Sequence, residues 1–247
     1  LWEGGSFVTN FTSGYRSPSL EELYNEGPHI GTVTFEIGDQ SLTRERSNGI
    51  ELSLRHNMNR LRINGSFFYY KLANFVFIAP QDADSNGNVD IEDGLPIGRF
   101  QQTDARFKGA DFTVDADLKN WLGAFFNADI VKANLQVTST PLPRITPARV
   151  RFGLEFRYKG LSVRPEAVFA AAKKPGDIFT LETPTAGYGL INLNASYTIV
   201  NKRTAHTFSV GTSNLGNRLY RNHLSFIKDL APEPGRGARF SYSVRFF

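Results

Sequence analysis

The dominant pattern along the chain is the alternation of apolar and polar residues at every second position. Phe112 and Val114, for example, alternate with Asp111, Thr113 and Asp115. Successive side chains of a β-strand point to opposite faces, so such a segment has one apolar face and one polar face. About ten segments of this kind can be traced, and they cover residues 5–15, 46–57, 60–78, 98–118, 121–133, 148–158, 161–172, 188–199, 204–213 and 237–247.

The connections between these segments alternate between short and long. The short ones lie near residues 56–60, 119–120, 159–160 and 200–203, and the long ones are polar stretches near 16–45, 79–97, 134–147, 173–187 and 214–236. Outer-membrane barrels have short periplasmic turns and longer extracellular loops, and their tilted strands need about 9–11 residues. The pattern therefore predicts an all-β, antiparallel, up-and-down transmembrane β-barrel, with the last residue on the periplasmic side.

A soluble β-sandwich is the alternative, because it also alternates apolar and polar positions. The length of the segments, the regular loop asymmetry and the charges along one face of nearly every segment favour the barrel. A water-filled or plugged barrel interior would accommodate those charged side chains. They can equally form a wall of positive and negative groups that neutralise one another.

Composition narrows the function classes. The chain has 247 residues, 21 Phe, no Cys and a net charge of +4 that is not gathered into one basic stretch. Disulfides, thiolate metal sites and cysteine nucleophiles are excluded, and nucleic acid is not a favoured partner. No apolar run reaches the ~18 residues of a spanning helix, and no secretory leader opens the chain, so we expect that further residues precede Leu1.

Several stretches resemble TonB-dependent outer-membrane receptors, and their order strengthens the resemblance. They are SGYRSPSLEELYNEGPHIGTVTFEIGDQSLTRERSNGIELSLRH (13–56), ANFVFIAP (73–80), LPIGRFQQTDARFKGADFTV (95–114) and TSNLGNRLYRNHLSFIKDLAPEPGRGARFSYSVRFF (212–247). The family's barrel is large and plugged, with 22 strands. The resemblance implies that residues 1–247 are about its last ten strands, with the plug domain absent from this chain.

The resemblance also implies a function and partners. It implies a Gram-negative outer-membrane receptor for TonB-energised uptake of a scarce ligand, such as a metal chelate or metal ion. The implied partners are membrane lipid, the plug and earlier strands, TonB through the N-terminal part, the barrel-assembly machinery and the ligand. A passive porin-like or adhesin barrel is one alternative. An outer-membrane hydrolase is less favoured, because no nucleophile motif is present, and we expect no enzyme.

An acidic stretch in the second long connection has the spacing of a calcium loop. Calcium loops place oxygen ligands at alternate positions around a glycine. No other cofactor is expected, and a solvated acidic turn is the alternative reading. The candidate ligands are Asp82, Asp84, Asn86, Asn88, Asp90 and Asp93.

Two histidines in long connections are candidate ligand-binding residues. His29 follows Glu26, and His223 precedes Asp229. Imidazole and carboxylate groups together can bind metal ions. The alternative is that all four are ordinary polar loop residues.

The last two residues are a candidate barrel-assembly signal. In this family the final Phe usually falls in the apolar register. Here Phe246 continues the apolar register of the last segment and Phe247 follows one position later. Phe246 therefore takes the usual role, or else the strand ends irregularly.

Overall fold

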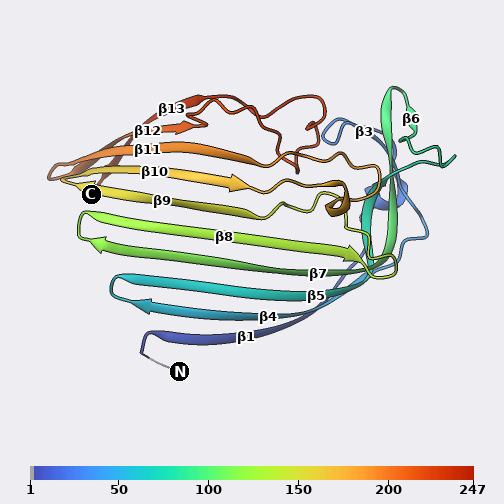
Figure 1. Cartoon of the computed structure of the whole chain (residues 1–247), viewed down its shortest axis with the longest axis horizontal. Helices are drawn as coiled ribbons and strands as arrows, with labels where there is room; N and C mark the ends of the chain where they lie inside the picture. Colours follow the sequence, from blue (N-terminus) through green and yellow to red (C-terminus); the bar gives the residue numbers. More distant parts are fainter. Residues whose placement is uncertain (1–2) are drawn as a thin grey trace.

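Ten long strands lie side by side in chain order in the computed structural model, which describes residues 3–247 (Figure 1). Each strand pairs antiparallel with the preceding one, and among the described residues β1 and β13 each pair on one side only. The ten antiparallel segments expected from the sequence are confirmed, with ends that differ by a few residues. The strands are β1 (Gly5–Arg16), β4 (Glu45–Met58), β5 (Leu61–Pro80), β7 (Leu95–Lys119), β8 (Leu122–Leu135), β9 (Arg149–Tyr158), β10 (Leu161–Ala170), β11 (Tyr188–Val200), β12 (Thr204–Ser213) and β13 (Gly237–Phe246).

Short turns and long loops lie at opposite ends of the sheet (Figure 1). Between β9 and β10 the turn has two residues, Lys159 and Gly160, with φ of 45° and 83°. Two positive φ values in succession suit the twist of a tight hairpin. A Cβ on Gly160 would lie 2.4 Å from the carbonyl oxygen of Thr198, so this position requires glycine. The five long connections are loop 1 (17–44), loop 2 (81–94), loop 3 (136–148), loop 4 (171–187) and loop 5 (214–236).

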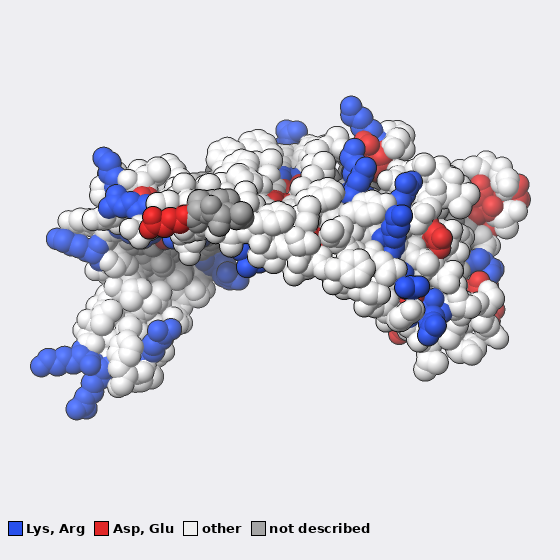
Figure 2. All heavy atoms as spheres, turned by 90° about the horizontal axis from the view of Figure 1, so that it is seen from below, with Lys and Arg blue, Asp and Glu red and all other residues white. Residues whose placement is uncertain are grey.

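The outer face of the sheet is formed by apolar side chains in register. Leu52, Phe67, Ala110 and Ile130 follow one another across four strands as direct partners. The next row includes Phe112, which is 43% exposed. No other layer of the described residues covers these side chains, in contrast to a sandwich core. The curvature of the sheet is visible in Figure 2, where a broad surface with few charges separates two charged ends.

The inner face of the same strands is polar. Arg149 pairs with Asp129 at 3.1 Å, and Arg157 pairs with Asp117 at 2.9 Å. Ser66 donates a short hydrogen bond to Asp111. The first and third of these contacts join neighbouring strands, and the Arg157–Asp117 pair reaches from β9 across β8 to β7, so much of the inner charge is neutralised within the sheet.

Loop 1 contains regular structure that the sequence pattern missed. It holds helix α1 (Leu20–Tyr24) and strands β2 (Glu26–His29) and β3 (Thr34–Ile37), whereas the sequence pattern predicted only a long polar connection near 16–45. Ser19 caps α1, and its side chain and that of Glu22 satisfy each other's backbone N–H groups. β3 then pairs in parallel with β7 at residues 97–99, beyond the last pairing of β7 with β8.

Two other long loops contain short elements, β6 (Ile91–Glu92) in loop 2 and the 3-10 helix η1 (Pro175–Asp177) in loop 4. Among the described residues no helix is both long enough and apolar enough to cross a membrane.

The main buried cluster lies on the inner face near the loop-bearing end. Phe77, Ala105 and Ala133 come from β5, β7 and β8, and Leu142 comes from loop 3. Phe179 of loop 4 packs against this cluster, with its ring centroid 5.8 Å from that of Phe77. Loops 3 and 4 therefore fold inward over the sheet.

Candidate functional site

All five long loops contribute to one cavity at the loop-bearing end of the sheet. The cavity has a volume of about 260 Å³, and we refer to it as the loop cavity. Its walls combine apolar side chains, such as Ile78 and Phe226, with a few charged groups. Apolar walls with a small number of placed polar groups are typical of ligand sites. The lining residues come from 32–34, 78–80, 89, 96–98, 143–144, 181–183, 226, 228 and 229.

A buried polar cluster supports one wall of the loop cavity. His223 is 1% exposed, and its Nδ1 lies 3.0 Å from the Thr185 hydroxyl. Its Nε2 lies 3.4 Å from Glu182, which also pairs with Lys228 at 3.4 Å. Burial and the nearby Lys228 lower the pKa of His223 to about 4, so the ring is neutral at pH 7.

Arg144 is the charged residue of the loop cavity whose hydrogen-bonding groups are not all paired. Its guanidinium lies 3.6 Å from the centroid of the Phe226 ring, and its buried Nη1 has no hydrogen-bond partner among the described residues. Burial lowers the pKa of Arg144, although the nearby charges of Glu182 and Asp229 oppose the shift. A guanidinium stacked on an aromatic ring is well placed to bind an anionic, planar group.

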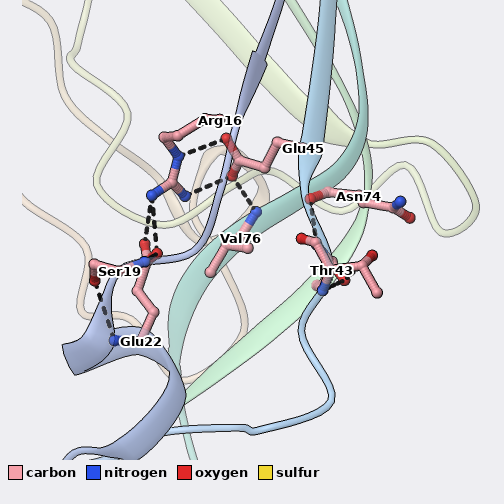
Figure 3. Close-up of polar contacts among 8 residues, drawn as sticks. Arg16, Ser19, Glu22, Thr43, Glu45, Asn74 and Val76 are labelled. Carbon is pink, nitrogen blue, oxygen red and sulfur yellow. Dashed lines mark hydrogen bonds and ion pairs between the residues drawn. The ribbon is translucent and has the colours of Figure 1, made fainter.

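The start of loop 1 is fixed to the sheet by a network of charged groups (Figure 3). Arg16 donates two hydrogen bonds of 2.7 Å to Glu45 and also pairs with Glu22 of α1 at 2.8 Å. Glu45 is buried and accepts the backbone N–H of Val76 at 2.6 Å. The network joins β1, β4, β5 and α1 at the point where loop 1 begins and ends.

A bulge in β5 lies next to this network. The register between β5 and β7 shifts between Leu72 and Phe75, and Asn74 has φ of 55°. The Gln102 amide donates to the carbonyl oxygens of Thr43 and Asn74, at 2.6 and 2.8 Å. A bulge bends its strand and increases the local twist. The bulge therefore marks where β5 and β7 leave the regular sheet for the loop cavity.

A family model described as "TonB dependent receptor-like, beta-barrel" matches residues 1–215. The chain belongs to this family of TonB-dependent receptor barrels. The family is one of receptors and not of enzymes, in agreement with the sequence analysis. The barrels of TonB-dependent receptors lie in the outer membrane, and such barrels have an apolar outer face toward lipid and a polar interior.

Solved structures of receptors and transporters share the fold. The copper transporter OprC is 18% identical with a TM-score of 0.78, over 98% of this chain and 37% of that chain. The ferric enterobactin receptor PfeA of Pseudomonas aeruginosa is 18% identical with a TM-score of 0.70, over 100% and 39%. The FrpB iron transporter of Neisseria meningitidis is 16% identical with a TM-score of 0.67, over 100% and 37%. This chain therefore spans less than two fifths of each of these three structures.

The candidate calcium ligands of the receptor barrel are only partly brought together. Carboxylate oxygens of Asp82, Asp84 and Asp90 lie within 4.8 Å of one another. Asn86 donates its side-chain amide to Asp84 at 2.8 Å. Asp82 and Asp84 accept backbone N–H groups of the same loop. The backbone N–H and the side-chain amide of Asn86 both donate to Asp84 and lower its pKa.

Asn88 and Asp93 occupy different positions in that loop. The side-chain amide of Asn88 donates to the Asn86 side chain at 3.0 Å. Asp93 has φ of 51° and forms the tight turn with Gly94 before β7. It is not among the carboxylates that lie together, so the calcium prediction now concerns Asp82, Asp84 and Asp90.

The two candidate histidines, His29 and His223, lie in different surroundings in the receptor structure. His29 is half-exposed in β2 and lies 3.4 Å from Glu36 of β3, whereas Glu26 is exposed at the other end of β2. His223 lies in the buried cluster, and Asp229 accepts a hydrogen bond from Thr183 at 2.7 Å. Asp229 therefore lines the loop cavity, but the carboxylate next to His223 is Glu182.

Sequence reasoning missed Glu182, Lys228, Arg144 and Phe226. They come from three different loops, and no local spacing connects them.

The candidate assembly signal lies at the end of the receptor sheet. Phe246 pairs with Thr204 in the outer register and is 75% exposed, while Phe247 donates its backbone N–H to the Arg203 carbonyl just beyond the strand.

Proposed function

We propose that this chain forms the C-terminal barrel part of an outer-membrane transporter that takes up an anionic metal chelate with energy from TonB. The observation that carries this proposal is that all five long loops meet in one cavity at the loop-bearing end of the sheet. Loops on a rigid scaffold are suited to capture a ligand.

One unpartnered donor of the loop cavity favours an anionic ligand over a bare metal ion. Two cations and two carboxylates line the cavity, so its formal charges balance: Lys228 pairs with Glu182, and Asp229 accepts a hydrogen bond from Thr183. The Nη1 of Arg144 has no hydrogen-bond partner among the described residues. A divalent cation at His223 would lie next to Lys228 and would be repelled by its charge. An anionic group at Arg144 would instead gain a charge-assisted hydrogen bond and contact with the Phe226 ring.

The open sheet supports an association with further strands and a plug. In a bilayer, unpaired backbone groups along β1 and β13 are costly, so other strands must close the barrel. We propose that these strands, together with a plug that contacts TonB, belong to the same receptor. Phe246 and Phe247 are proposed to contact the barrel-assembly machinery, and their exposure at the strand end makes them accessible.

The uptake proposal is tested with the complete receptor that carries this chain. Cells that lack the gene should grow more slowly than wild type under iron limitation with one supplied chelate and should recover with the wild-type gene. Growth that is equal with and without the gene under iron, zinc and cobalamin limitation would contradict uptake.

The role of Arg144 is tested by the same growth assay and by equilibrium binding of the chelate that supports growth. Arg144→Gln should weaken binding roughly 10- to 100-fold, because it removes a charge-assisted hydrogen bond. Arg218→Gln is the matched control, because Arg218 is an exposed arginine of loop 5 that does not line the cavity. Equal affinities for the two variants would show that the ligand binds elsewhere.

A further inference from the structure

Basic side chains form two adjacent rows on the outer face, directly beyond the apolar rows. In the first row Tyr69, Lys108 and Lys132 are direct partners across β5, β7 and β8. In the second row Lys71 lies opposite Arg106. The alternation of side chains along each strand places these residues on the same face as Phe67, Phe112 and Ile130. We call Lys71, Arg106, Lys108 and Lys132, together with Arg46 on β4, the basic rows.

The basic rows lie where the apolar surface ends, and not at the tips of the strands. On β8 the outer face is apolar from Leu122 to Ile130, which is about 26 Å along the strand at ~3.3 Å per residue. A tilt of about 40° reduces this to roughly 20 Å, which is comparable to the ~25 Å apolar band of an outer-membrane barrel once the side chains at its ends are included. β5 continues from Lys71 to Pro80, and β7 begins at Leu95, well beyond Arg106. The basic rows are therefore at the height of the lipid headgroups on the loop-bearing side.

The charges of the basic rows are not balanced by the protein. None of the five residues forms an ion pair within residues 3–247, in contrast to the paired arginines of the inner face. Lys71 faces Arg106 and Lys108 faces Lys132, and like charges directly opposite each other destabilise a sheet. Asp104 is an acidic residue on the same face of β7 and accepts the backbone N–H of Asn74 at 3.0 Å, but its single negative charge cannot balance five cations.

Neighbouring arginines extend the positive surface toward the edge of the sheet. Arg44 and Arg46 lie over the ring of Tyr15, at 4.6 and 5.7 Å from its centroid. Tyr15 is on the outer face of β1 and is 59% exposed. Aromatic rings at the headgroup level with basic residues beside them are typical of a membrane interface. Figure 2 shows basic side chains gathered toward the ends of the sheet.

We propose that the basic rows bind the phosphate groups of lipid headgroups in the outer leaflet of the membrane. Phosphates at this height would neutralise the opposed cation pairs, and the acyl chains of the same lipid would cover the apolar rows below. The inference rests on the proposed outer-membrane placement. It does not depend on which ligand enters the loop cavity.

The test measures binding of diphosphorylated lipid A to the purified complete receptor in detergent. Lipid A without its phosphates and inorganic phosphate are the comparison probes. Wild type should bind diphosphorylated lipid A at least about tenfold more tightly than the dephosphorylated form. Neutralisation should weaken binding roughly fivefold per residue, and high salt should weaken it further.

Two double variants, Lys71→Gln/Arg106→Gln and Lys108→Gln/Lys132→Gln, should each weaken binding about 25-fold. Lys108→Arg/Lys132→Arg keeps the charge and should bind like wild type. The matched control is Lys202→Gln/Arg203→Gln in the short turn at the opposite end, which should have no effect.

Three results would overturn the proposal. The first is equal binding by wild type and both glutamine doubles, provided that each variant folds as judged by heat-modifiable migration. The second is displacement of the lipid by inorganic phosphate at an equal concentration, which would indicate a site for free anions. The third is a change of oligomeric state in the glutamine doubles without a change in lipid binding, which would indicate a protein partner.

Discussion

The ten-strand sheet and the loop cavity differ in how far apart along the chain their contacting residues lie. In the sheet each of the ten long strands pairs with the long strand before or after it in the sequence, often through a turn as short as Lys159–Gly160. The cavity joins Thr32 to Asp229 and draws on all five long loops. The sheet is therefore a regular scaffold that follows from the alternation of residues within each strand. The cavity depends on contacts between loops that are far apart in the sequence, and these contacts can vary without disturbing the scaffold.

The largest effect should come from charge on the outer face of the sheet. Val210→Arg should destabilise the complete receptor by about 2–4 kcal/mol in a bilayer, because Val210 lies in an apolar outer row. Ser209→Arg places the same side chain on the inner face of the same strand and should cost much less. Urea unfolding of both proteins in lipid vesicles measures the difference. Equal losses would contradict the assignment of faces.

A smaller effect, confined to the loop cavity, should follow from pH. The folded cluster lowers the pKa of His223 to about 4, from the usual value of about 6.5. Between pH 4 and pH 6.5, His223 is protonated when the loop is open and neutral when the loop is closed. Closure therefore weakens as pH falls from about 6.5 to 4, by at most about 3 kcal/mol.

Hydrogen exchange at pH 7 and pH 5, corrected for the intrinsic rate, measures this opening. Residues 182–185 and 222–229 should exchange faster at pH 5, while the β9–β10 hairpin should be unchanged. His223→Gln should remove the pH dependence. A pH dependence that persists in this variant would assign the effect to another group.

The clamp at the start of loop 1 should have a more modest effect. Glu45→Gln removes the ion pair with Arg16 but keeps an oxygen for the Val76 N–H, so we expect a loss of about 1–3 kcal/mol in local closure. Faster hydrogen exchange in α1 would report it. Glu21→Gln, an exposed change in the same helix, should have no effect, and equal exchange in both variants would contradict the clamp.

The smallest effect concerns calcium in loop 2. If the ion binds at Asp82, Asp84 and Asp90, its affinity should be weak, of the order of 10⁻⁴–10⁻³ M as in other extracellular sites. Asp84→Asn should abolish the heat of calcium binding in a calorimetric titration, and Asp93→Asn should leave it unchanged. A wild-type receptor with no heat and no gain in protease resistance would rule the site out.

The sequence was sufficient for the sheet because period-two patterns are local. The long strand β7 was expected at 98–118 and runs over 95–119, and its outer and inner faces follow from the alternation around Phe112. The family resemblance added the type of barrel, which the alternation alone could not distinguish from other barrels.

The loop cavity could not be predicted in the same way. The sequence identified His223 and Asp229 as candidates, but the group beside His223 is Glu182, 41 positions earlier. Arg144 is one of many polar loop residues until loop 5 brings Phe226 under it. Convergence of distant loops depends on the finished sheet, so no pattern within one loop contains it.

The parallel pairing of β3 with β7 has a consequence for the order of folding. β3 ends at Ile37, and its partners at 97–99 are separated from it by the whole of β4 and β5. Contacts between residues so distant in sequence close late, because the intervening chain must first be ordered. The hairpins of the sheet can assemble one after another. Loop 1 can then pair with β7, and this pairing completes the loop cavity after β4, β5 and β7 have formed.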